Sequence, residues 1–208
     1  TRLVRDWSSD VCSSDLCEAL APIPNVEIHA LCTRTPERLA KLAQAFGVAN
    51  AFTDFNEMLA DPELDAVSIV TMWDQHRDPA IAALRANKHV LLEKPMASTL
   101  EECDAIIEEV DRSDRAFMVG HVCRFNPRYV TAKQEIEAGK IGKIVSMYAR
   151  RNVPAAVTED TLQKIGPIIG DGVHDTDLML WYTGAEITSA YAQTVRIRDL
   201  AHPDIGWT

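Results

Sequence analysis

Between residues 25 and 120, short apolar runs alternate with segments of helical periodicity, and this alternation constrains the fold more than any other feature. The runs that predict strands lie at residues 26–32, 51–52, 66–70, 89–92 and 116–120, and the segments that predict helices lie between them at residues 36–46, 56–60, 78–86 and 100–112. Strands that alternate with helices form right-handed βαβ units, whose parallel sheet is covered by helices on both faces. The sequence therefore predicts an α/β domain built on a parallel sheet.

Two of these helices have clear boundary signals. Thr35 is a predicted N-cap, Pro36 suits the first helical position, and Gly47 suits the left-handed residue that follows a helix. Thr99 and Glu102 have the spacing of a capping box. Both helices are thus expected to begin where the apolar stripe begins.

Beyond residue 120 the periodicity changes. Residues 127–138 and 172–182 predict helices, whereas residues 144–151 and 187–197 alternate as half-buried strands do. The pattern predicts a second, α+β domain over residues 121–208, with an open, mostly antiparallel sheet. Because a sheet of one or two strands is marginal by itself, we interpret this domain as incomplete and the chain as truncated.

Residues 1–16 fit neither pattern. They contain Ser-Ser-Asp twice, at 8–10 and 13–15, and show no apolar strand, no helical stripe and no signal-peptide core. We interpret them as a foreign or disordered segment. Parallel sheets that bind dinucleotides place a G-x-G-x-x-G loop after their first strand, but the first glycine in this chain is Gly47. The prediction is a dinucleotide-binding domain at residues 17–120 that lacks its first strand and phosphate loop.

Composition excludes several partners. The chain is 47% hydrophobic and carries a net charge of −10, so a nucleic-acid partner is not expected. No apolar run is long enough for a membrane helix, and none is expected. The five cysteines show no zinc-ligand spacing, so we expect no metal site, and reduced thiols favour a cytoplasmic protein.

The tripeptide Glu93-Lys94-Pro95 directly follows the predicted strand at residues 89–92. In parallel α/β sheets, ligands bind beyond the carboxyl ends of the strands. An ammonium group at that edge is placed for chemistry. The alternative is a surface lysine in an ordinary strand-to-helix loop, and the tripeptide alone does not separate the two readings.

A second group of titratable residues lies near the start of the helix predicted at residues 172–182. Asp171, His174 and Asp177 are three apart, so on an α-helix their side chains share one face. A histidine between two carboxylates suits proton transfer. The alternative is a capping aspartate, a partly buried histidine and a solvated aspartate.

Several segments in order resemble the Gfo/Idh/MocA oxidoreductases, over about residues 17–208. They are Pro-Asn-Val-Glu at 24–27, Asp-Pro-Glu-Leu-Asp-Ala-Val at 61–67, Glu-Lys-Pro at 93–95, Phe-Asn-Pro at 125–127 and His-Asp-Thr-Asp at 174–177. The resemblance implies a Rossmann-type domain and an enzyme that moves a hydride between a nicotinamide cofactor and a sugar, a cyclitol or a related polyol. It also implies a homo-oligomer formed through the sheet of the second domain.

The same resemblance implies roles for individual residues. Lys94 would bond the reacting hydroxyl and take part in acid–base chemistry, with His174 as its partner in proton relay. The remaining positions are Glu93, Pro95 and Arg124 near the cofactor, Asn126 and Asp177 near the substrate, and Asp171 as a catalytic carboxylate. The family's catalytic aspartate lies four residues before the histidine, where this chain has Gly170, so Asp171 is displaced by one position.

The choice of cofactor depends on the loop after the second strand of the family's domain. An acidic residue there usually bonds the ribose of NAD, but this chain has Thr33, followed by Arg34 and, one turn on, Arg38. Because an arginine can clamp a 2′-phosphate, NADP is favoured over NAD. We also expect Thr71, Trp73 and His76 to line the cofactor cleft.

Two further functions stay open at this point. One is a binding or sensor protein that keeps the fold without catalysis, and the other is a nicotinamide-dependent glycosidase. Net cofactor turnover would indicate the dehydrogenase, sugar release without turnover the glycosidase, and neither the sensor.

Overall fold

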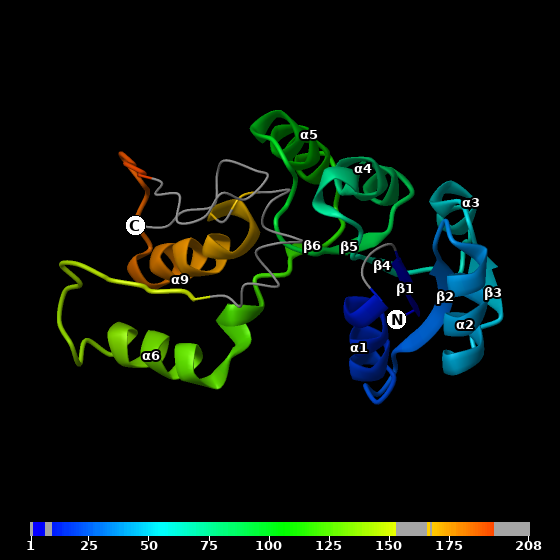
Figure 1. Cartoon of the computed structure of the whole chain (residues 1–208), viewed down its shortest axis with the longest axis horizontal. Helices are drawn as coiled ribbons and strands as arrows, with labels where there is room; N and C mark the ends of the chain where they lie inside the picture. The colour runs from blue at the N-terminus through cyan, green and yellow to red at the C-terminus, as the bar shows by residue number, and fades with distance from the viewer. Residues whose placement is uncertain (1, 7–9, 153–165, 167, 194–208) are drawn as a thin grey trace, which may run out of the picture. The chain divides into compact units, whose positions relative to one another are not determined.

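The computed structural model describes residues 2–6, 10–152, 166 and 168–193, with side chains from residue 15 onward. The chain divides into two compact units, Thr1–Gly120 and His121–Thr208, and each is described by itself (Figure 1).

The first unit is built on a six-stranded, all-parallel sheet with the order β3-β2-β1-β4-β5-β6. The strands are β1 (Arg2–Asp6), β2 (Glu27–Cys32), β3 (Asn50–Phe52), β4 (Ala66–Ile69), β5 (His89–Leu92) and β6 (Phe117–Val119). The order runs outward in both directions from the pair β1 and β4, as in doubly wound sheets. The predicted α/β fold with a Rossmann-type sheet is confirmed, and each predicted strand of this unit lies within two residues of its expected position.

The helices of this unit are α1 (Asp10–Leu20), α2 (Pro36–Phe46), α3 (Phe55–Leu59), the 3₁₀ turn η1 (Trp73–Gln75), α4 (Arg77–Arg85) and α5 (Leu100–Asp111). The four helices that the sequence predicts, α2 to α5, lie within one residue of their expected ranges, whereas α1 and η1 were not predicted. Thr99 and Glu102 form the expected capping box, and Gly47 ends α2 with φ 66°. Thr35 occupies the N-cap of α2, but its side chain makes no capping hydrogen bond.

The expectation that the sheet lacks its first strand, and that residues 1–16 hold neither strand nor helix, was wrong. Residues 2–6 form β1, which pairs in parallel with both β2 and β4, and residues 10–20 form α1. A sheet ladder is made by backbone N–H and C=O groups, so a short segment without the usual apolar alternation can still fill a central position.

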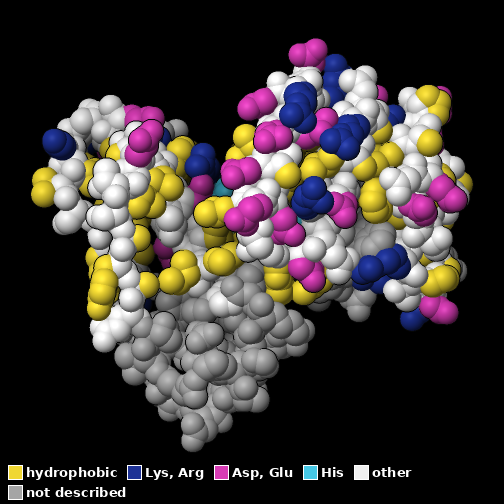
Figure 2. Space-filling view, turned by 90° about the horizontal axis from the view of Figure 1, so that it is seen from above, with side chains coloured by type: hydrophobic (Ala, Val, Ile, Leu, Met, Phe, Trp, Pro, Cys, Tyr) yellow, Lys and Arg dark blue, Asp and Glu magenta, His cyan; other side chains and the backbone are white. Residues whose placement is uncertain are grey.

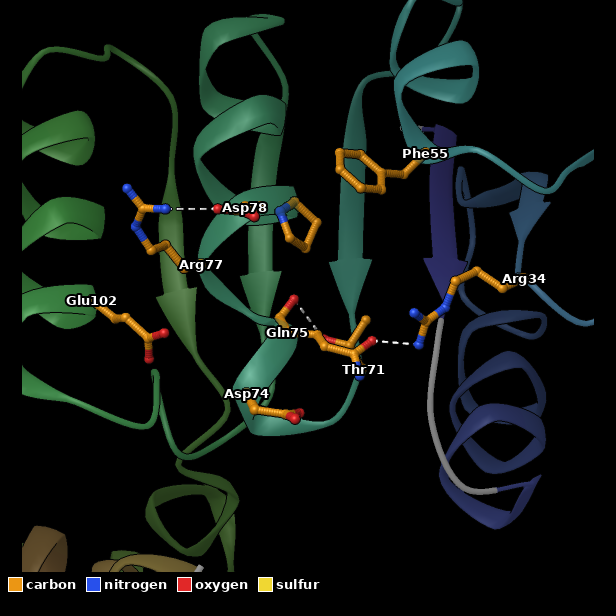
Figure 3. A pocket seen from close by; sticks show the side chains of 9 residues that line it. Arg34, Phe55, Thr71, Asp74, Gln75, Arg77, Asp78 and Glu102 are labelled. Carbon is orange, nitrogen blue, oxygen red and sulfur yellow. Dashed lines mark hydrogen bonds and ion pairs between the residues drawn. The ribbon is translucent and has the colours of Figure 1, made fainter.

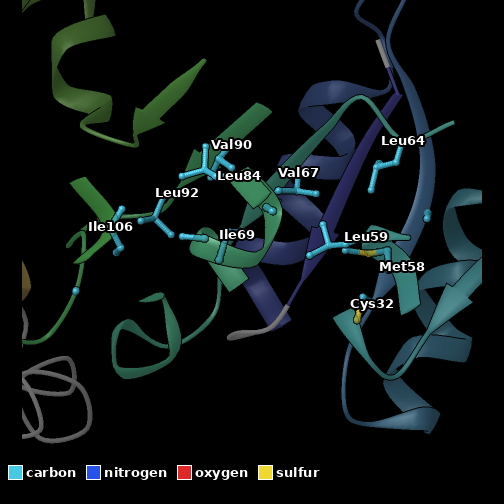
Figure 4. Packing of buried hydrophobic residues seen from close by; sticks show 14 residues of the cluster. Cys32, Met58, Leu59, Leu64, Val67, Ile69, Leu84, Val90, Leu92 and Ile106 are labelled. Carbon is cyan, nitrogen blue, oxygen red and sulfur yellow. The ribbon is translucent and has the colours of Figure 1, made fainter. Parts of the chain in front are cut away.

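The core lies on both faces of this sheet. On one face, residues of β4 and β5 pack with α3, α4 and α5, as seen around Leu84, Val67 and Ile69 in Figure 4. The other cluster consists of Cys17, Leu31, Leu39 and Val48. Ala30 belongs to the first cluster and its neighbour Leu31 to the second, because successive side chains of a strand point to opposite faces. On the outer side of α4 and α5, acidic and basic side chains are interspersed (Figure 2), and Arg85 pairs with Glu109.

The second unit contains η2 (Val122–Phe125), α6 (Pro127–Glu137), the π-helical turn η4 (Ile168–Gly172) and α9 (Val173–Thr183). Helices α6 and α9 contact each other: Lys133 Nζ donates to the Trp181 carbonyl at 2.7 Å, and the Tyr182 hydroxyl donates to the Tyr129 carbonyl at 3.2 Å. Both helices were predicted from the sequence.

The two strands predicted in this unit are not observed where the structure describes them. Residues 144–151 and 187–193 lie in no strand and are mostly exposed, and residues 194–197 lie outside the described part of the chain. Alternating polar and apolar residues suit a half-buried strand, but a strand forms only where a neighbouring strand pairs with its backbone. Neither segment has such a neighbour within the described residues. The open antiparallel sheet is therefore not confirmed.

Candidate functional site

The carboxyl ends of β2, β4 and β5 bring three of the predicted site segments to one edge of the sheet. Thr33 and Arg34 follow β2, Thr71 follows β4, and Glu93 follows β5. The backbone supports this edge directly: Glu93 N–H donates to the Ile69 carbonyl at 2.8 Å, and Thr33 N–H donates to the Phe52 carbonyl at 3.1 Å. Parallel strands put these segments together, as expected for a ligand-binding edge.

A pocket of about 290 Å³ opens at this edge, and Arg34 and Thr71 both line it (Figure 3). Arg34 donates from Nη2 to Gln75 Oε1 at 2.6 Å, and the Thr71 hydroxyl donates to the Gln75 carbonyl at 3.3 Å. Asp74 and Glu102 add negative charge to the same lining. Arg77 and Asp78 line it as well, so the pocket offers two arginines, a hydroxyl and three carboxylates to a polar ligand.

Three other residues expected near the cofactor have different surroundings. Arg38 is half-buried on α2, and Trp73 is half-buried in η1; neither belongs to the pocket lining. His76 is 1% exposed and faces the protein interior. Its ring lies between two backbone carbonyls, with Nδ1 2.8 Å from Pro95 O and Nε2 3.0 Å from Thr71 O. Burial lowers the pKa of His76, against the opposing influence of these carbonyls.

The Glu93-Lys94-Pro95 turn is partly enclosed. Glu93 and Lys94 are half-buried, Pro95 is buried, and the Lys94–Pro95 peptide bond is cis. Burial raises the pKa of the Glu93 carboxyl, and the positive charge of Lys94 opposes that rise. Gly120 leaves room for this carboxyl, because a Cβ there would lie 2.8 Å from Glu93 Oε2. The turn thus presents an amine and a carboxyl side by side in sequence.

In the second unit, the predicted residues Arg124 and Asp177 bind each other. Arg124 donates to both carboxylate oxygens of Asp177, at 2.9 and 2.6 Å, and His121 Nδ1 lies 3.7 Å from the same carboxylate. Asp177 is 8% exposed. This hydrogen-bonded pairing raises the pKa of the Arg124 guanidinium. His174, also 8% exposed, lies one turn before Asp177 on α9.

Asp171 does not share an α-helical face with His174, contrary to the spacing argument. It lies in the π-helical turn η4, and α9 begins only at Val173. A π-turn closes i→i+5 hydrogen bonds and so has a different angular step from an α-helix. Asp171 Oδ2 lies 3.7 Å from Arg151 Nε, and the same arginine binds Asp175 through both carboxylate oxygens at 2.8 and 2.9 Å.

Asn126, expected near the substrate, has a local role in the structure. It is the N-cap of α6, and its side-chain oxygen accepts a hydrogen bond from the Arg128 backbone at 3.0 Å. Asn followed by Pro at the first helical position is a common helix start.

Sequence reasoning missed the partners that hold these residues: Gln75, Gly120, His121, Arg151 and Asp175. Only Gly120 carried a local signal, as a glycine at the end of a strand beside another backbone segment. Within residues 15–152, 166 and 168–193, no group of three or more His, Cys, Asp or Glu side chains could hold a metal ion. No helix of the described residues is long and apolar enough to cross a membrane.

Two family models match the chain. The model described as "Oxidoreductase family, NAD-binding Rossmann fold" matches residues 13–121, and the model described as "GFO/IDH/MocA C-terminal domain" matches residues 129–205. The first alone covers more than half of the 208 residues. The chain therefore belongs to the Gfo/Idh/MocA family of oxidoreductases.

Curated relatives include several inositol dehydrogenases. The chain is 37% identical over 166 residues to "Inositol 2-dehydrogenase 2" of Saccharopolyspora erythraea, a match that covers 78% of this chain and 47% of that protein. It is 33% identical over 168 residues to "scyllo-inositol 2-dehydrogenase (NAD(+))" of Bacillus subtilis, covering 80% of this chain and 49% of that protein.

Among solved structures, the chain is similar to the scyllo-inositol dehydrogenase from Lactobacillus casei with bound NAD(H) and scyllo-inositol. The TM-score is 0.77 at 27% identity, and the match covers 88% of this chain and 56% of that one. The chain thus spans about half the length of the relatives it matches.

Proposed function

We propose that a protein of the relatives' full length containing these residues is an NAD(P)-dependent oxidoreductase. It would transfer a hydride between the nicotinamide and a hydroxyl or carbonyl carbon of a cyclitol, sugar or related polyol. The observation that carries the proposal is Lys94, an amine beyond the carboxyl end of β5 at the same sheet edge as the polar pocket. Family membership and the names of the relatives support the reaction class.

The residues can be given roles in that reaction. Oxidation of a carbinol removes a hydride from carbon, which the nicotinamide accepts when bound, and a proton from the hydroxyl. Lys94 would bond that hydroxyl and pass on the proton, and His174 would be its partner in the relay. Asp177, held by Arg124, would orient the substrate side, and Asn126 would lie nearby. Asp171 would act as a further carboxylate.

The fit of a dinucleotide differs along its length. Arg34 and Thr71 suit the adenosine ribose, whose hydroxyls or phosphate they can bind, and Glu93, Pro95 and Arg124 would lie toward the nicotinamide. Thr33, Arg38, Trp73 and His76 would support or border the cofactor. The sequence between β1 and α1, Trp-Ser-Ser at 7–9, contains no glycine, and close approach of a pyrophosphate favours glycine there. We therefore expect this chain to bind NADPH or NADH weakly, above the low-micromolar range, in a fluorescence titration.

The experiment that tests the function is turnover of cyclitols and sugars in the full-length protein, followed by cofactor absorbance. Lys94→Ala should lower kcat by roughly 10²–10⁴-fold, the usual contribution of a positioned acid–base group. Lys41→Ala, which changes an exposed lysine on α2, is the control and should leave kcat unchanged. An unchanged kcat in Lys94→Ala would remove Lys94 from the mechanism.

A preference for NADP(H) over NAD(H) is a finer proposal, and Arg34 carries it. A guanidinium can bind a 2′-phosphate through two hydrogen bonds, but Arg34 would first have to leave Gln75. Arg34→Ala should therefore shift the ratio of kcat/KM for the two cofactors toward NAD. An unaltered ratio would contradict the assignment.

We further propose that residues 1–16 are foreign to the gene, although residues 2–6 supply the strand β1. Residues 17–120 would then be the family's own part of the cofactor domain, and residues 121–208 would begin a domain with an open, mostly antiparallel sheet. The full-length protein would form a homo-oligomer through that sheet in the cytoplasm. Light scattering on the full-length protein tests the assembly, and a monomer would contradict it.

A further inference from the structure

His76 is buried between two loops that both leave the carboxyl edge of the sheet. His76 lies in the segment that follows β4, and its ring nitrogen Nδ1 contacts the carbonyl of Pro95 in the loop after β5. With 1% of its surface exposed, the ring is part of the interior rather than of the pocket lining. A buried polar ring needs hydrogen-bond partners, and here both lie on the backbone.

We infer that His76 is a positioning residue for Lys94: its ring holds the Pro95 carbonyl and so fixes the turn that carries the amine. The inference rests on the proposed function for its catalytic meaning, but the contact itself does not depend on any activity.

The Pro95 carbonyl is the natural point of attachment in this turn. Proline has no N–H group, so its nitrogen cannot be held by donating a hydrogen bond. Its carbonyl can accept, and His76 Nδ1 lies 2.8 Å away. On the other side of the turn, Glu93 N–H is already bonded to Ile69. Lys94 therefore lies between two anchored residues, one held by the sheet and one held by the histidine.

The two ring nitrogens are not equivalent in this arrangement. A neutral imidazole donates from one nitrogen only, and burial favours the neutral ring. In the arrangement that we infer, Nδ1 donates to Pro95 O at 2.8 Å, while Nε2 lies 3.0 Å from Thr71 O. Protonation of both nitrogens would satisfy both carbonyls, at the cost of burying a charge.

This asymmetry allows a matched pair of variants. The amide nitrogen of asparagine can replace Nδ1, and the amide nitrogen of glutamine can replace Nε2. His76→Asn should therefore keep the donor to Pro95, whereas His76→Gln should keep only the donor to Thr71. His76→Phe keeps the ring volume and removes both donors.

The readout is the rate at which Lys94 of this chain is acetylated by sulfo-N-hydroxysuccinimidyl acetate, measured by mass spectrometry relative to exposed Lys41. Lys94 is half-buried, so loosening of the turn should speed its modification. His76→Gln and His76→Phe should raise the rate about fivefold, the factor that corresponds to one net hydrogen bond. In His76→Asn, Lys94 should be acetylated at nearly the same rate as in the unaltered chain.

The control is His89→Gln, because His89 is another histidine of the same unit with a backbone partner, Ala116 N–H at 2.9 Å. It should leave the acetylation of Lys94 unchanged. If His89→Gln also raised the rate, or if Asn and Gln at position 76 behaved alike, the effect would be general destabilisation and the inference would be wrong.

A second measurement needs no variant. Long-range ¹H–¹⁵N spectra of the unaltered chain should show a proton on Nδ1 of His76, and a ring protonated only on Nε2 would overturn the inference. In the full-length protein, kcat should follow the same order, with Asn above Gln. Absence of any dehydrogenase activity would sink the proposed function and leave the acetylation and NMR results standing.

Discussion

In the first unit the loops after β4 and β5 are held through backbone groups, whereas in the second unit two aspartates are held by paired arginine side chains. Glu93 is bonded through its N–H to Ile69, and Pro95 and Thr71 offer their carbonyls to His76. In the second unit Arg124 donates two hydrogen bonds to Asp177, and Arg151 donates two to Asp175.

The two modes place different demands on the sequence. Backbone bonds of a parallel sheet follow once the strands pair, and they tolerate many side chains. A bidentate arginine–carboxylate pair requires two particular side chains in a fixed geometry. We therefore expect the first unit to depend on its apolar core and the second on its ion pairs.

The largest expected effect is in the core of the first unit. Leu92 in β5 is 0% exposed, and truncation of such a leucine to alanine costs about 2–5 kcal/mol through lost burial and the cavity left behind. Leu92→Ala should lower the free energy of unfolding by that amount, measured from hydrogen exchange of the β5 and β6 amides in urea.

Leu100→Ala is the matched control, because Leu100 is 78% exposed at the start of α5. It should change the free energy by less than about 0.5 kcal/mol. Equal effects of the two substitutions would mean that the core cluster does not stabilise the sheet edge that carries Lys94.

The next effect concerns the Arg124–Asp177 pair. Arg124→Met removes both hydrogen bonds and leaves a buried carboxylate, which costs about 1–3 kcal/mol. Protection of the α9 amides against exchange should fall accordingly. Arg128→Met, at an exposed arginine of α6, should leave that protection unchanged.

A double variant sharpens this prediction. Replacing both partners, as in Arg124→Met with Asp177→Leu, removes the stranded charge and should recover much of the lost stability. If the double variant were no more stable than Arg124→Met alone, the cost would arise from lost packing of the arginine on Trp181, whose ring centre lies 5.9 Å from the guanidinium.

The same contrast explains what the sequence could predict. The capping box at Thr99, the left-handed Gly47 and the strand at residues 89–92 are local signals, and all three are confirmed. The pairs Arg124–Asp177 and Arg151–Asp175 join residues 53 and 24 positions apart, and no local pattern marks them. Asp171 was placed beside His174 by a spacing rule that holds only for an α-helix. It lies in a π-helical turn, so the rule does not apply to it.

Strand β1 was missed for a related reason. Its central place depends on hydrogen bonds to β2 and β4 on either side, which a single segment of sequence does not display. Residues 144–151 show the converse, because they alternate like a strand but have no neighbouring strand among the described residues. For β1 and for residues 144–151 alike, pairing with neighbouring strands, rather than the strand propensity of the segment, decided whether a strand formed.

The smallest expected effect is a pH dependence that originates at Glu93, a carboxyl held in the backbone-supported region without a bidentate arginine. Burial raises the pKa of Glu93 above its ordinary value. The native state therefore binds this proton more tightly than the unfolded chain does. The resulting stabilisation is fully present below the unfolded pKa of about 4.3 and is lost as the pH rises through the raised pKa.

Glu93→Gln keeps the shape of the side chain and removes the titration. The stability of the unaltered chain relative to this variant should fall as the pH rises from about 4 toward neutrality, measured as the difference between their urea midpoints. Glu101→Gln gives a control of opposite sign, because hydrogen bonds to its own backbone and to Thr99 lower the pKa of Glu101. Its stabilisation is present above the unfolded pKa and lost as the pH falls. Parallel pH profiles for the unaltered chain and Glu93→Gln would show that the ionised carboxyl is well solvated. The enclosed turn around Lys94 would then be as open to water as the exposed start of α5.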